Sequence, residues 1–452
     1  MPERVGFGPL QETQTDVFSN TIDLFTPEHV EFGIKERKSF VVNPLQSLDS
    51  GPYSFRIQSS GNGFFDPSSL RTKIHMRIKK KNDTGDIVAL TEADNTKVFP
   101  VNLLSKSIIK DVSVWMNHVP VSVNSLKTYG MRCYIANLLT YGVDAEKGLL
   151  KINYWEKDTI GKMDSLTENT KGLARHAYIA KSKLVKIYDN VQTELTTCPR
   201  LILPTTEILL TFDMEDTKKF LMHPVGDTYV MEIEHFSLSY DRVYLHDQIH
   251  DKIERQLSVK SPAIYPITKT EHRSKSFAPG VLSMNWPQMY YGNVPESVVV
   301  CFTAEEAHDD MPTKNMYNFQ NFSVTKLQLS VESQQFPLYP LEFDFTNEDA
   351  IEGYKHLLDN SGIDITNAPS LITYDEFQKG SFIVPFDLTP DKCSLYHAHK
   401  KHTGNLSLKV ELGTKLTEGV TLHFFAVYRD TIYIHGKMGE REVITGVSYN
   451  TV

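Results

Sequence analysis

The sequence predicts an all-β fold made of two tandem β-sandwiches with a few short helices. Three observations lead to this prediction: many short segments alternate apolar and polar residues, few segments have helical periodicity, and the two halves repeat one another. The 452 residues are 40% hydrophobic and 23% charged, which is typical of a globular chain of about two to three domains. The net charge of −9 argues against an overall basic surface that wraps nucleic acid.

The alternating segments predict the strands. Between residues 73 and 79, the side chains of Ile74, Met76 and Ile78 fall on one face and polar residues fall on the other. This period of two is typical of a half-buried strand. The same pattern, bounded by Gly, Pro, Asn and Asp, predicts strands at residues 54–58, 111–116, 207–212, 229–240, 297–302, 326–331, 381–386, 407–412 and 421–428. Many short strands separated by turns favour a sandwich or a barrel.

A few segments have helical patterns. They span residues 124–139, 246–257 and 346–358. Asn124 or Ser125 would cap the first of these helices. Residues 346–349 resemble a capping box that opens the last helix, and Gly362 follows its end. The polar helix at residues 246–257 lies between the two strand-rich halves, as a linker would.

The two halves contain the same four features in the same order. A hairpin strand followed by a proline comes first, then a helix that closes with two leucines, then two alternating strands. The matched segments are 112–114 with 329–331, 120 with 337, 138–139 with 357–358, 208–212 with 406–410, and 240–245 with 428–434. Such a duplication predicts two sandwiches of roughly 200 residues each, and closing each one as a jelly roll leaves only short strand edges exposed.

The repeat also predicts a division of the chain. We expect a first jelly roll at residues 31–245, a linker at residues 246–264 and a second jelly roll at residues 265–435. Residues 1–30 have weak periodicity, and we expect an N-terminal arm that becomes ordered on assembly. Residues 436–452 form a C-terminal tail whose role the sequence leaves open.

The remaining composition indicates a chain made in a reducing compartment. The four cysteines, Cys133, Cys198, Cys301 and Cys393, are widely spaced and form no CxxC pair. We therefore expect reduced, mostly buried thiols rather than a zinc ribbon or a disulfide framework. The N-terminus lacks the apolar region of a cleaved signal peptide. No run of about 18 apolar residues occurs, so we expect no membrane-spanning helix.

Motifs for catalysis or metal binding are weak. The P-loop, HExxH and GxSxG patterns do not occur. The best metal candidate is the group of His397, His399 and His402, because a strand would place the first two on one face. Lys400 and Lys401 lie among them and would repel a cation, so a solvated loop is the favoured interpretation. The sequence therefore predicts no catalytic residue, no cofactor and no metal site.

Other charged groups have ordinary explanations. His246 and His250 lie one helical turn apart on the predicted linker helix, without a third ligand. The basic run at residues 77–81 could contact DNA, but an exposed strand end is the favoured interpretation. The acidic residues at 305–306 and 309–310 do not have the spacing of an EF-hand. Core or interface packing is the expected role of Trp115, Trp155 and Trp286.

Several segments, taken in order, resemble the double jelly-roll major capsid proteins of Polinton/Maverick elements and adintoviruses. This lineage also includes virophage capsid proteins and adenovirus hexon. The similar segments span residues 43–57, 108–142, 154–159, 265–269, 295–300 and 386–391. The resemblance runs from about residue 20 to about residue 435, and the two ends match no family pattern.

The resemblance implies a structural protein rather than an enzyme. Family members form homotrimers whose six jelly rolls make a pseudo-hexameric capsomer, and capsomers tile an icosahedral shell around double-stranded DNA. The implied partners are further copies of the chain and minor or vertex capsid proteins, with DNA contacted only indirectly. The implied location is the virion, after synthesis in the host cytoplasm. Two similar rolls in each of three subunits give six near-equivalent walls, which suits a hexagonal lattice site.

Alternatives remain open at this point. A jelly roll hosts many functions, so a tandem lectin-like binding module is one alternative. An enzyme on a β-sandwich is another, although the absent motifs argue against it. Within the capsid class, the chain could be a minor or vertex protein, but such proteins usually have one roll. The long polar segments 141–200 and 303–322 are candidates for outer-surface loops or for ordinary connections.

Overall fold

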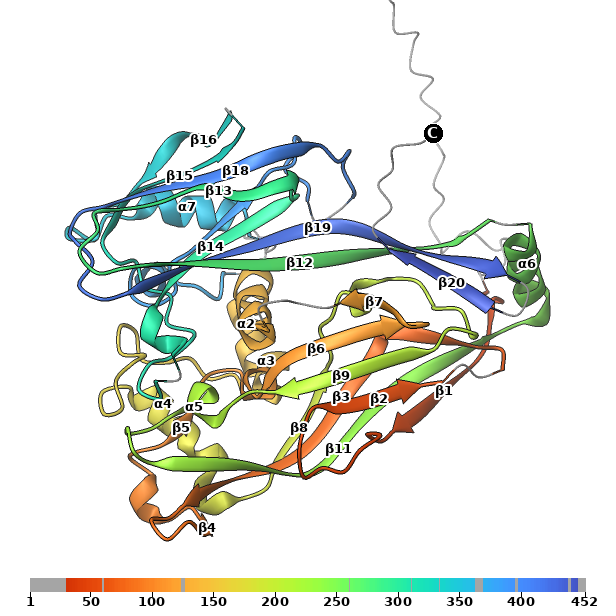
Figure 1. Ribbon diagram of the computed structural model, residues 1–452, viewed down its shortest axis with the longest axis horizontal. Helices are drawn as coiled ribbons and strands as arrows, with labels where there is room; N and C mark the ends of the chain where they lie inside the picture. The colour runs from red at the N-terminus through yellow and green to blue at the C-terminus, as the bar shows by residue number, and fades with distance from the viewer. Residues whose placement is uncertain are drawn as a thin grey trace, which may run out of the picture.

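The computed structural model describes residues 30–58, 61–122, 127–259, 261–309, 311–332, 334–361, 369–394, 397–437 and 440–445. The fold is all-β with a few short helices, and it consists of two jelly rolls that follow one another along the chain (Figure 1). The predicted fold class is confirmed. Every predicted strand segment overlaps a strand of the structure.

The first jelly roll contains two main sheets. One has the strand order β1 (Ile34–Val42), β11 (Thr228–Leu245), β3 (Gly63–Lys81) and β4 (Ile87–Ala89), with β8 (Val185–Asn190) also paired to β3. The other has the order β2 (Tyr53–Ile57), β9 (Ile208–Met214), β6 (Ile109–Met116) and β7 (Val119–Ser122). A small ribbon pairs β5 (Phe99–Pro100) with β10 (Leu221–Met222).

The second jelly roll repeats this arrangement. One sheet has the order β12 (Ala263–Phe277), β19 (Val420–Lys437), β14 (Ser297–Ala304) and β17 (Ile383–Asp387), with β20 (Glu440–Thr445) on β19. The other has the order β13 (Ser283–Asn293), β18 (Thr403–Leu412), β15 (Val324–Val331) and β16 (Gln334–Glu342). The segments that the sequence matched occupy equivalent places, since β6, β9 and β11 correspond to β15, β18 and β19.

Helices fill the connections. The α-helices are α1 (Leu104–Ser107), α2 (Tyr129–Thr140), α3 (Leu149–Ile152), α4 (Thr170–Ala174), α5 (Thr217–Phe220), α6 (Asp247–Ser258), α7 (Ile351–Asp359) and α8 (Tyr374–Gln378). The 3-10 turns are η1 (Glu92–Asp94), η2 (Val143–Lys147), η3 (Arg175–Tyr178), η4 (Ala180–Ser182), η5 (Leu195–Thr197) and η6 (Glu305–Ala307). Among the described residues, no helix is long and apolar enough to cross a membrane.

The helix predictions were partly wrong at their starts. The polar helix between the halves is confirmed as α6, with His246 at its N-cap. The helix α2 begins only at Tyr129, with Thr128 at the N-cap position, and the caps proposed at residues 124 and 125 lie outside the described residues. The capping box predicted at residues 346–349 does not form. Those residues form an exposed turn before α7, in which Asp344 accepts hydrogen bonds from the backbone of Thr346 (3.2 Å) and Asn347 (3.1 Å).

A true capping box forms elsewhere. Thr373 and Glu376 cap α8 reciprocally, with the Thr373 side chain accepting from the Glu376 backbone and the Glu376 carboxylate accepting from the Thr373 backbone. The helix α7 instead begins at Ile351, and Gly362 lies outside the described residues. The sequence pattern of a capping box therefore marked a turn at residues 346–349 rather than a helix start.

The core of the first roll lies between its two sheets. Phe55 of β2 and Phe212 of β9 meet Phe236 of the opposite sheet, with ring centroids 4.7 and 5.2 Å from that of Phe236. These three rings are essentially fully buried. Edge-to-face aromatic packing of this kind adds to the hydrophobic free energy of burial. The alternating apolar residues that predicted the strands are therefore the residues that hold the sandwich together.

The two rolls are in contact through α2. Figure 1 shows this helix between the two sets of sheets. Tyr134 of α2 stacks on Tyr317 of the second roll, with ring centroids 4.3 Å apart and planes inclined by 7°. Gly130 of α2 leaves room for this ring, since a Cβ atom at that position would lie 2.7 Å from the Tyr317 hydroxyl. The long polar segments meet at the same boundary, where Asp164 accepts a hydrogen bond from the Asn315 backbone at 2.8 Å.

Candidate functional site

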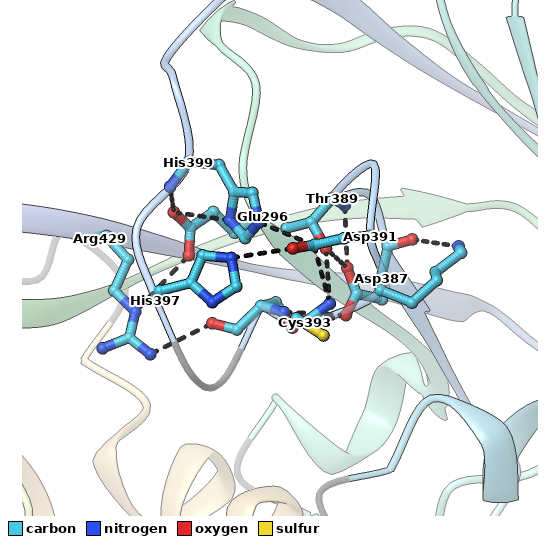
Figure 2. Close-up of polar contacts among 10 residues, drawn as sticks. Glu296, Asp387, Thr389, Asp391, Cys393, His397, His399 and Arg429 are labelled. Carbon is cyan, nitrogen blue, oxygen red and sulfur yellow. Dashed lines mark hydrogen bonds and ion pairs between the residues drawn. The ribbon is translucent and has the colours of Figure 1, made fainter. Parts of the chain in front are cut away.

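The loop between β17 and β18 carries the densest polar network near the histidines that the sequence singled out (Figure 2). Asp387 closes β17 and organises the turn that follows. One of its carboxylate oxygens accepts hydrogen bonds from the backbone and hydroxyl of Thr389, at 2.9 and 2.6 Å. The other accepts from the backbone and hydroxyl of Ser394, at 3.2 and 2.8 Å. Lys392 donates to the Asp387 carbonyl at 2.6 Å, so the turn is held from several directions.

This turn places Asp391 against two imidazoles. The Nε2 atom of His397 lies 2.8 Å from Asp391 Oδ2, and the Nε2 atom of His399 lies 2.8 Å from Asp391 Oδ1. The two imidazole rings are 4.7 Å apart. The ligand atoms of these three residues all lie within 4.8 Å of one another. Desolvation opposes the charged form of Asp391, but hydrogen bonds from His399, the Cys393 backbone and His397 outweigh it and lower the Asp391 pKa.

A second layer holds His399 in place. Glu296, the residue before β14, accepts a hydrogen bond from the His399 backbone N–H at 3.1 Å. Its Oε1 atom also lies 3.8 Å from His399 Nδ1, which is buried. Arg429 of β19 lies 3.6 Å from the other oxygen of Glu296 and donates to the Ser394 carbonyl. Neighbouring strands of the sheet therefore orient this part of the loop.

The segment lies in a loop, as the favoured sequence interpretation expected, and this loop brings His397 and His399 together. The structure changes the sequence interpretation in two other ways. His402 is exposed and is outside the cluster. Asp391 and Glu296 were missed. Asp391 lies only a few residues before His397, so the sequence could have indicated it. Glu296 is distant in sequence, and only the sheet pairing brings it near.

The other sequence candidates do not form a second cluster among the described residues. His246 occupies the N-cap position of α6 without a side-chain capping hydrogen bond, and the ring centroids of His250 and Phe64 are 6.0 Å apart. Glu306 lies 3.7 Å from Lys314, and Asp310 lies outside the described residues. Trp155 is buried against Tyr134, as the packing interpretation expected.

The basic run at residues 77–81 is largely neutralised by carboxylates. Arg77 and Lys79 pair with Glu234 and Glu232 of the adjacent strand β11, at 2.5 and 2.6 Å. Lys80 contacts Asp227 at 2.9 Å. The interpretation as an exposed strand surface is supported, because cations paired in this way contribute little to phosphate binding.

A row of histidines crosses the second roll, with His423 fully buried and the other two members partly buried. His423 of β19 lies between His272 of β12 and His308, with nitrogen atoms 3.0 Å apart at each step. Thr303 contacts His423 Nε2 at 2.9 Å, and Thr128 of the first roll contacts His272 Nδ1 at 3.0 Å. Because each neutral imidazole has one donor and one acceptor nitrogen, a row of this kind can be satisfied without any charge.

Burial keeps this row neutral. Desolvation lowers the pKa of His272 from 6.5 to about 3, and His308 adds electrostatic repulsion. Desolvation also lowers the pKa of His423 far below its ordinary value, with repulsion from His308 and His272. The pKa of His308 falls for the same reason, with Lys219 adding to the effect and Asp309 opposing it. All three side chains are therefore uncharged at neutral pH.

The first roll buries ion pairs instead. Arg175 and Asp158 are almost fully buried and lie 2.6 Å apart. Lys106 and Asp189 are similarly buried and lie 3.0 Å apart. Arg132 of α2 contacts buried Glu194 at 2.5 Å. Further hydrogen bonds satisfy these buried charged groups. Their partners are the Ser105 hydroxyl, the Asn169 amide and the Pro100 and Glu156 carbonyls.

Comparison with known proteins shows which fold this arrangement represents. A chain of the Sputnik virophage structure matches with a TM-score of 0.62 at 11% identity, over 96% of this chain and 93% of that one. The Faustovirus major capsid protein matches with a TM-score of 0.55 at 8% identity, over 92% of each chain. The mavirus major capsid protein matches with a TM-score of 0.50 at 13% identity, over 98% of this chain and 97% of that one.

The chain has the fold of viral double jelly-roll major capsid proteins. These structural neighbours are capsid proteins and not enzymes. No family model matches the sequence. An uncharacterized protein of Caenorhabditis elegans is 22% identical over 371 residues, which cover 79% of this chain and 85% of the relative.

Proposed function

We propose that this protein is a major capsid protein that assembles as homotrimeric, pseudo-hexameric capsomers. The observation that carries the proposal is the repeated two-roll architecture, which matches viral major capsid proteins over nearly the whole length of both chains. We assign residues 31–245 and 265–435 to the two rolls and residues 246–264 to the linker that contains α6. Residues 1–30 would be an arm. The tail expected at residues 436–452 includes β20 (Glu440–Thr445), which pairs with β19 and extends the sheet of the second roll.

The repeat supports trimer formation by symmetry. Equivalent strands occupy equivalent places in both rolls, so each subunit offers two similar walls around a threefold axis. Three subunits then give six walls, which match the neighbours of a hexagonal lattice position. Large obligate interfaces, beyond about 2,000 Å² of buried surface, are expected for such a trimer.

Exposed apolar side chains support self-association. Leu338 and Tyr339 of β16 are 70% and 75% exposed, and the nearby α7 residue Ile351 is 67% exposed. The strand β16 is at one end of its sheet order. On β1, at the end of a sheet in the other roll, Val41 is 68% exposed. Apolar residues at sheet edges are liabilities in a monomer and are expected to be covered in an assembly.

The proposed partners follow from this role. Capsomers would contact one another in an icosahedral shell and would contact minor or vertex capsid proteins. Double-stranded DNA would lie inside the shell without specific contacts, which agrees with the carboxylate-paired basic run on β3. The protein would reside in the virion after synthesis in the host cytoplasm.

The principal alternative is a tandem jelly-roll binding module, and a minor capsid protein is a further alternative. The two-roll architecture favours the major component over a single-roll minor protein. A binding module predicts a monomer or dimer, whereas the capsid proposal predicts a trimer or larger shells.

Light scattering coupled to size exclusion, followed by electron microscopy, tests the proposal. A particle near three times the chain mass of 51.5 kDa with hexagonal outlines, or closed shells, would support it. A monomer that never assembles over a range of salt and pH would overturn it and favour the binding module.

A second experiment tests the N-terminal arm. Deletion of residues 1–30 should leave trimers intact but impair shell formation. Normal shells from the truncated chain would refute the proposed arm.

A further inference from the structure

We propose that Asp391, His397 and His399 bind a divalent transition-metal ion, with Zn²⁺ as the ion of choice. The three residues lie in the loop between β17 and β18, and they supply one carboxylate and two imidazoles. This donor set suits zinc and its neighbours in the first transition row better than magnesium or calcium, which prefer oxygen ligands alone. The site is independent of the capsid proposal, because it rests on the side chains of one subunit.

The distances require a modest rearrangement. Ligands bound to zinc at roughly 2.0–2.2 Å in tetrahedral geometry lie about 3.3 Å from one another. Each Nε2 atom is 2.8 Å from a different oxygen of Asp391, and the ligand atoms all lie within 4.8 Å of one another. The short contacts would have to open by about half an ångström, and the widest separation would have to close by up to about 1.5 Å, to admit an ion. The exposed position of His397 (58% of its side chain) allows this movement without disturbing the core.

The surroundings resemble the second layer of a zinc site. His399 presents Nε2 to Asp391, and its buried Nδ1 atom lies 3.8 Å from Glu296 Oε1, so a small shift of the ring would bring it within hydrogen-bond distance (Figure 2). Metal-bound histidines usually donate their other nitrogen to a carboxylate, which fixes the tautomer and the ring orientation. Asp391 is fixed in a comparable way, because its Oδ1 atom accepts a hydrogen bond from the Cys393 backbone at 3.1 Å.

The nearby cations are engaged elsewhere, which answers the main objection from the sequence. Lys401 lies 3.6 Å from Asp430. Lys392 donates to the Asp387 carbonyl, and Arg429 contacts Glu296 and Ser394. Lys400 is exposed and can extend into solvent. The charge around the three ligands is therefore less unfavourable than the order of residues along the chain indicates.

The proposed ion would fasten the loop and leave a position open. Asp391 lies within the turn that Asp387 organises, and the two histidine ligands follow that turn. One ion would therefore cross-link two parts of the connection between β17 and β18. Three protein ligands leave a fourth position on zinc, which water or a side chain of another subunit would complete.

Calorimetric titration with Zn²⁺ tests the site on the full-length protein, purified without a histidine tag and stripped with a chelator. We expect one ion per chain, and Co²⁺ should give the intense visible absorption of a tetrahedral site. His397→Ala and Asp391→Asn should each weaken Zn²⁺ binding at least tenfold. Glu296→Gln should weaken it about 10- to 100-fold through the orientation of His399.

The matched control is His402→Ala, which removes an exposed histidine of the same loop that is outside the cluster. It should leave the affinity unchanged. Circular dichroism of each metal-free variant checks that the fold is retained. Absence of saturable binding by the unaltered protein, or an equal loss of affinity in His402→Ala and His397→Ala, would overturn the proposal.

Discussion

The two jelly rolls share a topology but bury their polar groups in different ways. The first roll contains buried ion pairs, such as Arg175 with Asp158 and Lys106 with Asp189. The second roll contains a row of neutral histidines, His272, His423 and His308, on the sheet formed by β12, β19 and β14. Two sandwiches with the same strand order therefore stabilise their buried polar side chains in different ways.

The difference follows from the kinds of chain segment that each roll contains. The segment at residues 141–200 of the first roll consists mainly of short helices and turns, which leave backbone carbonyls without ladder partners. Arg175 donates to the carbonyls of Pro100 and Glu156 as well as to Asp158, so one guanidinium joins three segments. In the second roll, long strand ladders satisfy the backbone of β12, β14 and β19, and the histidines of the row contact one another and threonine hydroxyls.

The largest effect should come from Arg175→Met in the first roll. Removing the guanidinium leaves the buried carboxylate of Asp158 without its charge partner, and two carbonyls lose a donor. We expect a loss of about 3–5 kcal/mol in the free energy of unfolding, as is typical of a broken buried pair. Urea unfolding of the two proteins measures the difference. A loss below about 1 kcal/mol would show that the pair is not the organising contact.

The second effect is acid sensitivity that is greater in the second roll, although desolvation also lowers the pKa of buried His223 in the first roll. The pKa of His272 is lowered from 6.5 to about 3, so its unfolded form binds a proton at a higher pH than its folded form. The stability that comes from neutral His272 is therefore complete above pH 6.5 and is lost progressively as the pH falls toward 3. Between pH 6.5 and 4.5 one such group costs about 2–3 kcal/mol, at roughly 1.4 kcal/mol per pKa unit.

The labelling rates of two buried cysteines measure which part of the molecule opens as the pH falls. Cys301 of β14 is opposite His423 in the sheet, and Cys133 is buried in α2 beside the first roll. Labelling with an acid-tolerant disulfide reagent should become faster at Cys301 than at Cys133 as the pH falls from 7 to 4.5. His423→Gln, which cannot be protonated, should reduce this pH dependence. Equal acceleration at both cysteines would contradict a difference between the rolls.

Much of the sandwich was predictable because burial leaves a periodic signal. Strands such as β3 and β9 have one face in the core, so their apolar residues alternate. The strands β1 and β16 are mostly exposed and lie at sheet ends, so they carry no such alternation and were not predicted. The capping-box pattern at residues 346–349 was misleading, since the hydrogen bonds of Asp344 stabilise a turn there.

The polar clusters were less predictable than the strands. His397 and His399 are close in sequence and could be noticed, but Glu296 reaches them only through the pairing of distant strands. His272, His308 and His423 are spread over three elements, and nothing in the local sequence of each distinguishes a buried histidine from an exposed one. Contacts of this kind depend on tertiary structure rather than on local pattern.

A smaller effect concerns the boundary between the rolls. Gly130→Ala places a methyl group 2.7 Å from the Tyr317 hydroxyl and 3.2 Å from the Lys106 carbonyl. Overpacking of this kind costs typically about 1–3 kcal/mol. The matched control is Gly148→Ala, where no atom lies within 4 Å of the new Cβ. Thermal unfolding should show a lower midpoint for the first variant, and equal midpoints would indicate that α2 does not hold the rolls together.

The smallest effect should come from exposed ion pairs, which both rolls possess. Lys79 pairs with Glu232 in the first roll at 2.6 Å, and Lys326 pairs with Glu342 in the second at 2.7 Å. Exposed pairs contribute little because water screens the charges and the long side chains lose conformational freedom. Lys79→Gln and Lys326→Gln should therefore leave the unfolding midpoint unchanged within error. A shift in either variant as large as that of Gly130→Ala would show that surface charge, and not only buried charge, distinguishes the two rolls.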